Sequence, residues 1–297
     1  MAAGAPVTAT PFIEKTSERN RPWEWPWWRT TPRQAGIFAW IILIHLVALA
    51  GILMYPLPGW RIFLAAIALA WLGGIGTTVC YHRAIAHRAL TLNPFVRCVL
   101  TFFAIFNGSG APVSWTAHHR LHHASADTDD DISSPRHGFW WAHLRWLWQV
   151  QRPSALRYCP DLDGFSYHMW TIAQAPILAA SFFFGWYFGA AAFFWLGAIR
   201  LVFALHGQCF VNSVCHTQPD VREGEDSSRN VGWLAPVLLV LGENWHRNHH
   251  SRPGLARLGW TWRQLDAGYL VIRVLEKVGL ASEVRDFRQL RSLSSEN

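Results

Sequence analysis

Nine of the fifteen histidines in this chain fall into a repeated pattern, and no other feature constrains the fold so strongly. Residues 82–87 read HRAIAH, 119–123 read HRLHH, 246–250 read HRNHH, and His216 ends the sequence Asn212-Ser-Val-Cys-His. Imidazole suits zinc, copper, iron and nickel, and a single zinc takes three or four protein ligands. Nine imidazoles therefore indicate two metals in one site, so the fold must bring all four segments to one place.

The spacing of the histidines predicts how they are presented. His119, His122 and His123 stand at positions i, i+3 and i+4, which share one face of a helix, and residues 246–250 repeat this spacing. The two histidines of the first motif are five residues apart, which is about 140° around an ideal helix. Those two side chains diverge unless the helix ends or widens there, or unless they bind different metals.

The composition is that of a membrane protein. Hydrophobic residues make up 51% of the chain and charged residues 15%, against about 25% charged residues in soluble domains. A spanning helix needs roughly 20 apolar residues. Four segments meet this requirement, at about residues 36–55, 60–79, 170–186 and 187–211. The short connection within each pair predicts two hairpins.

A fifth apolar stretch, residues 94–112, lies between the first and second histidine motifs. A full crossing would put those motifs on opposite sides of the membrane, where they could not share a metal. Gly108, Gly110 and Pro112 also interrupt the end of the stretch. We therefore expect a re-entrant or interfacial helix, which is tolerated where protein buries it.

Four crossings place both termini and all the histidine motifs on one face of the membrane. Arginines crowd the segments on that face, whereas Arg61 alone lies near the other side, so by the positive-inside rule the histidine face is cytoplasmic. The formal charge of +7 fits contact with anionic headgroups, and no nucleic-acid-binding motif is present. Residues 1–35 lack the apolar stretch of a signal peptide. We expect a cytoplasmic or interfacial tail over residues 1–35 and one domain over residues 36–297.

Together the motifs resemble those of the membrane fatty acyl desaturase family, in particular its acyl-CoA or acyl-lipid delta-9 branch. The segments GFWWAH at 138–143, GENW at 242–245 and RLGW at 257–260 are also similar. The resemblance implies an all-α integral membrane protein with four transmembrane helices in two hairpins and a cytoplasmic helical cap that carries a histidine-rich di-iron site. It also implies that O2 is used to introduce a cis double bond into a long-chain fatty acyl substrate.

The resemblance further implies the ligands of the two irons. Asn212 would contribute through a bound water, and no catalytic residue beyond the metal ligands would be needed. The implied ligands are His82, His87, His119, His122, His123, His216, His246, His249 and His250.

The chain departs from the family pattern at one place. Many relatives carry Asp-Pro-His shortly after the second motif, and here Asp131-Ile132-Ser133 occupies that place. Because the histidine of those relatives is not an iron ligand, we expect the metal centre to be retained. The acyl or headgroup contacts nearby are expected to differ, which leaves the substrate open.

Two other classes of function remain in competition. A related di-iron membrane hydroxylase or decarboxylase would use the same ligands, so that only its product would distinguish it. A metal transporter should place its ligands near the membrane midplane, and a haem electron carrier would show haem absorption. The NSxxH and GENWH contexts favour desaturation.

The electron donor is expected to be a separate protein, because no fused haem domain is recognisable. A ferredoxin, a rubredoxin or a b-type cytochrome would serve. The acyl group could be carried by coenzyme A, a glycerolipid or a carrier protein, and the chain length and double-bond position stay open at this stage.

Acidic residues near the motifs are candidates to orient the imidazoles from behind. These candidates are Asp127, Asp129, Asp130, Asp131 and Glu243. The tryptophans at the N-terminal side resemble an interfacial belt, and they are Trp23, Trp25, Trp27 and Trp28.

We expect the other histidines not to bind metal. His118 is predicted to face solvent or to support a ligand. His45 and His206 lie in predicted membrane helices, where polar residues are costly and often functional, and a buried hydrogen bond lining an acyl tunnel stays open for them. Interfacial or supporting positions are expected for His137, His143 and His168.

Overall fold

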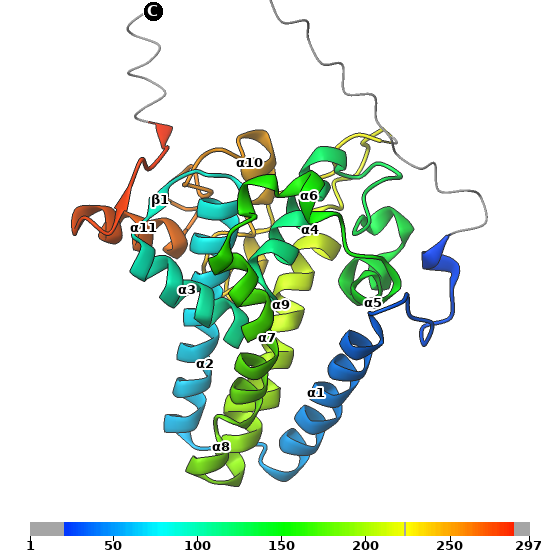
Figure 1. The fold of residues 1–297 in the computed structure, drawn as a ribbon, viewed down its shortest axis with the longest axis vertical. Coiled ribbons are helices and arrows are strands. Elements are labelled where there is room, and N and C mark those ends of the chain that lie inside the picture. The colour runs from blue at the N-terminus through cyan, green and yellow to red at the C-terminus, as the bar shows by residue number, and fades with distance from the viewer. Residues whose placement is uncertain (1–20, 223, 288–297) are drawn as a thin grey trace, which may run out of the picture.

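A computed structural model describes residues 21–222 and 224–287. These residues form helices almost throughout, and two short strands, β1 (Thr91–Leu92) and β2 (Ala281–Ser282), pair antiparallel. Long helices make up the lower part of the molecule in Figure 1, and shorter helices and loops form a cap above them.

Four helices in the described part of the chain are long and apolar enough to cross a membrane. The first is α1, and the second is α2 continued by a π-helix, η2. The third is α7 with the short 3-10 helix η6, and the fourth joins α8, the π-helix η7 and α9. Their bounds are α1 Ala35–Met54, α2 Trp60–Ile75, η2 Gly76–Ala86, α7 Phe165–Phe183, η6 Trp186–Phe188, α8 Ala190–Phe194, η7 Trp195–Ile199 and α9 Arg200–Cys215.

The number of candidate spans agrees with the sequence prediction, but several boundaries differ. The second helix runs past residue 79 to Ala86, so it carries the first histidine motif out of the apolar segment. The third begins at Phe165, five residues before the predicted start at 170, and the fourth begins at Ala190. Gly189 separates the last two with a φ of 103°, a backbone conformation that favours glycine.

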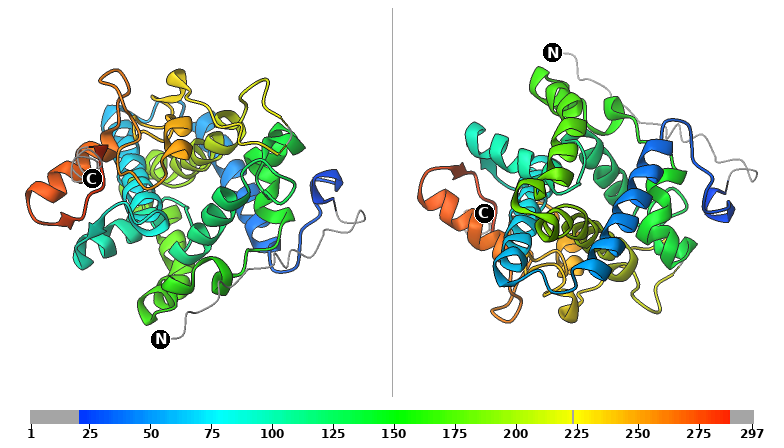
Figure 2. Two further views of the ribbon diagram at one scale, coloured as in Figure 1. Left: turned by 90° about the horizontal axis from the view of Figure 1, so that it is seen from above. Right: turned by 90° about the horizontal axis from the view of Figure 1, so that it is seen from below.

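The cap is built from short helices. In Figure 2, α11 lies at the edge of the cap on the side away from the N-terminal segment. The remaining elements are η1 Pro22–Glu24, α3 Pro94–Phe106, α4 Pro112–Ser125, η3 Pro135–His137, η4 Trp141–Arg145, α5 Trp146–Gln149, α6 Ala155–Tyr158, η5 Pro160–Leu162, η8 Gly232–Leu234, α10 His246–Ser251 and α11 Ala267–Lys277.

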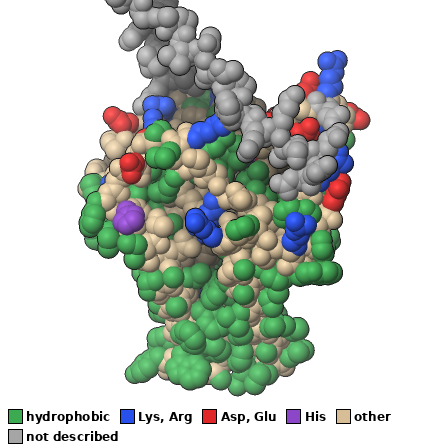
Figure 3. Space-filling view, turned by 45° about the vertical axis from the view of Figure 1, so that its right-hand side comes forward, with side chains coloured by type: hydrophobic (Ala, Val, Ile, Leu, Met, Phe, Trp, Pro, Cys, Tyr) green, Lys and Arg blue, Asp and Glu red, His purple; other side chains and the backbone are tan. Residues whose placement is uncertain are grey.

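The surface divides at the junction of the two parts. On the face shown in Figure 3, the lower half carries almost only hydrophobic side chains, whereas Lys, Arg, Asp and Glu lie in the upper half. Exposed large side chains such as Leu46, Leu53 and Leu57 belong to this lower half of the helices and their connections. An apolar surface of this extent requires lipid rather than water, so the chain is a membrane protein.

Helix α3 ends inside the protein, next to the long helices. It has 13 residues, fewer than the roughly 20 needed for a crossing. Its last carbonyl, that of Phe106, accepts hydrogen bonds from Ser181 of α7 and from Arg200 of α9. Arg200 is 2% exposed and also donates to Asn107 Oδ1 at 2.7 Å. A buried guanidinium therefore faces the negative end of the helix dipole, which lets α3 end without water.

We predict that Arg200→Met destabilises the protein by on the order of 3 kcal/mol, because the buried carbonyl of Phe106 and the amide of Asn107 lose their charged donor. The measurement is thermal unfolding in detergent. Arg61→Met is the matched control, since Arg61 is exposed and contacts only the ring of Trp60 among the interactions found. Equal unfolding temperatures for the two variants would contradict this role of Arg200.

Candidate metal site

The nine histidines of the motifs lie on, or directly after, four elements: η2, α4, α9 and α10. His82 belongs to η2 and His87 follows its end, while the second motif lies within α4. His216 follows the last residue of α9, and the third motif begins α10. The motifs therefore lie near, at or just beyond the ends of helices.

The structure brings all nine histidines together in two groups. Within each group one ring nitrogen from every histidine lies within 4.8 Å of the others. The first group is His82, His87, His119, His123 and His249, and the second is His122, His216, His246 and His250. The second and third motifs each divide their side chains between the two groups, so the two groups are neighbours.

A wider helix solves the spacing problem of the first motif. Residues Gly76–Ala86 form a π-helix, and the amide of His87 donates to the carbonyl of His82 at 3.1 Å. A π-helix bonds residues five apart, so residues 82 and 87 stand about one turn from each other. Their rings lie 5.0 Å apart between centroids, and both belong to the first group.

The Nε2 atoms point toward one another across each group. In the first group, Nε2 of His249 lies 3.0 Å from that of His82 and 2.9 Å from that of His123. In the second group, Nε2 of His216 lies 3.1 Å from that of His122 and 2.9 Å from that of His246.

Carboxylates occupy the opposite side of four of the rings. Nδ1 of His122 lies 2.9 Å from Asp131, Nδ1 of His216 lies 2.8 Å from Asp127, and Nδ1 of His250 lies 2.8 Å from Asp226. Glu243 takes the same position behind His82, at 2.9 Å. Because an ionised carboxylate can only accept a hydrogen bond, each of these rings carries its proton on Nδ1.

This arrangement fits a metal and does not fit a metal-free hydrogen-bond network. His122 and His216 both have Nδ1 bound to a carboxylate, so in their neutral forms their two Nε2 lone pairs face each other at 3.1 Å. Two lone pairs repel, whereas a cation between them is bound by both. Neutral imidazole with a carboxylate behind it is the usual form of a histidine ligand.

The acidic candidates from the sequence divide into two sets. Asp127, Asp131 and Glu243 stand behind ligand-type histidines, whereas Asp129 is exposed and no contact with a histidine is found for Asp130 in the described chain. Asp226, which sequence reasoning missed, stands behind His250. It lies in a polar loop without regular spacing, so no sequence pattern distinguishes it from solvated acids.

The departure from the family pattern has a structural role. Ser133 donates from its amide at 3.0 Å and from its hydroxyl at 3.1 Å to Oδ1 of Asp131. The other oxygen of Asp131 faces His122. Ser133 thus orients the carboxylate of Asp131, which in turn orients the ring of His122 in the second group.

The electrostatics favour ionised acids in the site. Burial alone would raise the pKa of Asp131, but His122 and hydrogen bonds from the backbone outweigh it and lower that pKa. Asp226 behaves likewise, and its pKa falls to about 2 because His250 outweighs burial. Burial lowers the pKa of His119, His246 and His249. Burial also lowers the pKa of His122, but Asp131 outweighs it and raises that pKa, so binding of a divalent cation at this ring would displace a proton.

Asn212 lies on α9, one turn before His216, and is half-buried. No hydrogen bond of its side chain is found among the described residues. Two buried ring atoms, Nδ1 of His246 and Nδ1 of His249, also lack a protein partner there. These groups are where bound water would be needed.

The other histidines stay outside both groups. His118 donates from Nδ1 to the carbonyl of Ser114 at 2.7 Å, and its ring meets that of Trp146 edge to face. Its side chain is half-buried, and burial lowers its pKa to about 4. His137 stacks on Trp23 at 3.7 Å, and His168 is exposed.

Three histidines form a separate chain below the cap. Nε2 of His45 lies 3.0 Å from Nε2 of His206, and Nδ1 of His206 lies 2.7 Å from Nε2 of His143. Nδ1 of His45 faces the carbonyl of Ile41 at 2.6 Å, and Nδ1 of His143 faces the Ser213 hydroxyl at 2.8 Å. This chain joins α1, α9 and η4.

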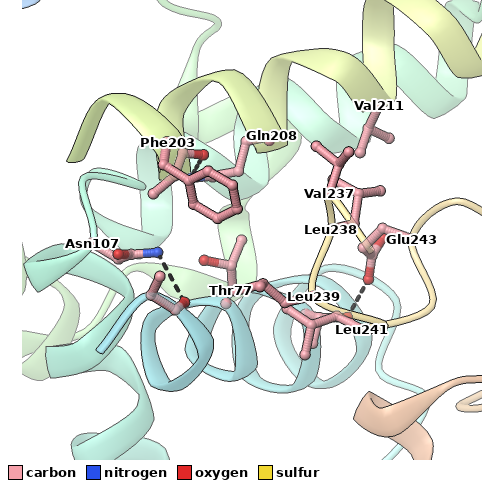
Figure 4. Close-up of a pocket in the computed structure, with 15 residues that line it drawn as sticks. Thr77, Asn107, Phe203, Gln208, Val211, Val237, Leu238, Leu239, Leu241 and Glu243 are labelled. Atoms are coloured by element: carbon pink, nitrogen blue, oxygen red, sulfur yellow. Dashed lines mark hydrogen bonds between the residues drawn. The ribbon is translucent and has the colours of Figure 1, made fainter. Parts of the chain in front are cut away.

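A cavity adjoins the first histidine group. It has a volume of about 70 Å³, lies between α2, α9 and the segment 237–241, and is partly open, and its lining is mainly apolar. Glu243 lies at one end of it (Figure 4). Thr78 also lines the cavity and donates a hydrogen bond to Glu243. Because Glu243 also stands behind His82, the cavity reaches the residue that supports a ligand-type histidine.

Comparison with known proteins identifies the family. A sequence profile named fatty acid desaturase matches residues 58–277. The chain belongs to the fatty acid desaturase family. It is therefore an oxidoreductase of the desaturase class whose substrate is a fatty acyl group or lipid, and the two histidine groups fit the metal centre of such an enzyme.

Named relatives cover most of the chain. Delta-9 acyl-lipid desaturase 1 of Arabidopsis thaliana is 32% identical over 92% of this chain and 89% of its own length. The sn-1 stearoyl-lipid 9-desaturase of Synechocystis sp. is 32% identical over 86% of this chain and 81% of its own length. An acyl-CoA 5-desaturase of Anemone leveillei is 32% identical over 82% of this chain and 79% of its own length.

We predict that Asp131→Asn lowers metal affinity by roughly 10- to 100-fold, because loss of a carboxylate behind a ligand has this effect in other sites. The measurement is metal content of the purified protein after dialysis against a graded chelator. Asp129→Asn is the matched control, since Asp129 is exposed and its replacement should leave metal content unchanged. If both variants retain metal equally, the carboxylate behind His122 has no part in binding.

Proposed function

We propose that this desaturase uses O2 to introduce a cis double bond into a long-chain fatty acyl group at a histidine-bound di-iron centre. The observation that supports it is the pair of histidine groups whose Nε2 atoms converge beside an apolar cavity. A double bond at the delta-9 position is the proposed regiochemistry, because two of the relatives above are named for position 9.

The ligands of the proposed irons are the nine motif histidines, five in the first group and four in the second, with Asn212 acting through a bound water. Two bound irons would supply the O2 chemistry that removes two hydrogens from unactivated methylenes, which no side chain can do alone. The chain's own residues hold the Nδ1 protons away from the metals and keep the imidazoles oriented. No other catalytic residue is required.

The proposed reaction balances as one saturated acyl chain, one O2, two electrons and two protons giving one cis alkene and two waters. A separate one-electron carrier must supply the electrons. A ferredoxin, a rubredoxin or a b-type cytochrome would serve, and the excess of Lys and Arg over Asp and Glu, 26 against 19, suits an acidic donor.

The acyl channel is proposed to be the cavity between α2 and α9. Its apolar walls would hold an extended acyl chain and exclude water from the reacting carbons. The acyl chain enters as an ester of a glycerolipid or as a thioester of coenzyme A, and both kinds of substrate occur among the names of the relatives.

The proposed topology has four crossings in two hairpins, with both termini and the histidine cap on the cytoplasmic side. Residues 36–297 form the desaturase domain, and residues 1–35 precede it as a cytoplasmic or interfacial tail. The helix α3 lies between the first two motifs without crossing. The distribution of arginine supports this sidedness, since only Arg61 lies near the opposite end of the spans.

We predict that expression in a host without the corresponding product yields a new cis monoene, and that His123→Ala abolishes it because the first histidine group loses a ligand. Gas chromatography–mass spectrometry of total fatty acids is the measurement. His168→Ala, at an exposed histidine outside both groups, should leave the product unchanged.

The same spectra distinguish the runner-up reactions. A product heavier by one oxygen, or a shortened chain, would identify a hydroxylase or a decarboxylase in place of a desaturase. Purified protein should contain two irons per chain, and protein that binds no iron would contradict the di-iron proposal.

A second prediction concerns the channel. Ala70 lines the cavity on α2, and its carbonyl accepts a hydrogen bond from Asn107, which lies at the end away from Glu243 (Figure 4). We expect Ala70→Phe to shift the products toward shorter acyl chains by roughly tenfold, since one or two methylenes in an apolar site are worth this much discrimination. Chain lengths of the monoenes are measured in the same way, with Ala65→Phe, on the same helix but outside the cavity lining, as the control. Unaltered chain lengths would exclude this cavity as the acyl channel.

A further inference from the structure

Arg83 directly follows the first ligand-type histidine, and its guanidinium is almost completely enclosed. It is 1% exposed. Its Nη1 donates to the carbonyl of Ala256 at 2.8 Å, and its Nη2 donates to the carbonyl of Leu241 at 2.9 Å. Nη2 also donates to the Thr78 hydroxyl at 3.2 Å. The guanidinium thus contacts segments that lie far apart in the sequence.

Asp266 holds the guanidinium in one orientation. Its two oxygens lie 2.9 and 3.2 Å from Nη2 and Nη1 of Arg83. The same carboxylate accepts the amides of Leu258 at 2.8 Å and of Tyr269 at 2.9 Å, the latter at the start of α11. A planar fork paired with a carboxylate fixes direction as well as distance.

The backbone approaches this ion pair so closely that two positions have no space for a Cβ atom. At Gly242, where φ is 101°, a Cβ atom would lie 2.6 Å from Asp266 Oδ1 and 3.0 Å from Arg83 Nη2. At Gly268, a Cβ atom would lie 2.8 Å from the same Nη2 and 2.9 Å from the carbonyl of Leu241. Two glycines therefore allow the turn 241–243 to close directly onto the ion pair.

This turn carries both a wall of the cavity and a support of the metal site. Leu241 and Glu243 line the cavity, as does Thr78. Glu243 also stands behind His82. The position of the turn therefore sets the distance between the side chains that would hold an acyl chain and the histidines that would hold the metal.

We propose that Arg83 is a positioning residue that determines which methylene pair is desaturated, by pinning the turn 241–243 between the cavity and the first histidine group. This inference rests on the proposed function. An acyl chain is a row of equivalent methylenes, so the wall that holds it decides which pair reaches the metal. A displacement of about 1 Å is enough to change such a reaction by 100-fold.

The relatives are consistent with local control of this choice. Enzymes named for position 9 and for position 5 are equally identical to this chain, at 32% each. Overall identity to this chain therefore does not distinguish the two positions.

The test is Arg83→Lys, which keeps the charge but cannot form the fork. Positional isomers of the monoene are located by derivatisation and mass spectrometry, and metal per chain is measured in parallel. We expect the ratio of minor to main isomers to rise roughly tenfold, the discrimination that one methylene provides. Arg273→Lys makes the same chemical change at a partly exposed pair with Glu276, and it should leave the ratio unchanged.

Asp266→Asn provides an independent variant. Asparagine keeps the size and can still accept the amide of Tyr269, but it no longer orients the guanidinium, so the isomer ratio should rise in the same direction. A metal-loaded variant of either kind that makes less product with the wild-type ratio would overturn the proposal. Loss of metal-loaded protein in both would assign Arg83 to folding and would overturn it too.

The product of the wild-type protein distinguishes failure of this inference from failure of the proposed function. Wild-type protein that forms no double bond would refute the proposed function and the inference with it. Wild-type protein that forms one isomer, beside variants that form the same isomer in the same ratio, would refute the inference alone.

Discussion

The cap depends on imidazole lone pairs that converge with no protein donor between them. Carboxylates hold the Nδ1 protons of His122 and His216, so their Nε2 atoms face each other as acceptors at 3.1 Å. A metal ion or a proton between the two Nε2 atoms makes such an arrangement favourable. Because the two histidines come from α4 and from the end of α9, the cation that binds there also joins distant parts of the chain.

The spacing of residues in the sequence predicts only which side chains share a face of a regular helix. The positions of His119, His122 and His123 on one face follow from α4, and the four long helices follow from apolar runs of sufficient length. The convergence of His82 and His87 depends on a π-helix, whose wider turn no local pattern announces.

Contacts between residues far apart in the sequence were not predicted, for a physical reason. Asp226 lies in an irregular loop, and only the folded chain brings it to His250. Arg200 lies near the middle of the fourth predicted span, where the sequence does not show its partner, and the folded chain buries it against the end of α3. In both cases the interaction joins two distant segments, and no periodic pattern in the sequence relates them.

The chain of three histidines also fixes how α1 is turned about its own axis. The carbonyl of Ile41 can only accept, so His45 carries its proton on Nδ1, and His206 and then His143 must each donate from Nε2. The bonds from His143 to His206, from His206 to His45 and from His45 to Ile41 therefore run in the same direction with neutral rings. A shift of α1 by one residue would rotate His45 by about 100° away from α9. The rotational setting of a lipid-facing helix is thus held by a directional, neutral contact, where apolar packing alone would permit several settings.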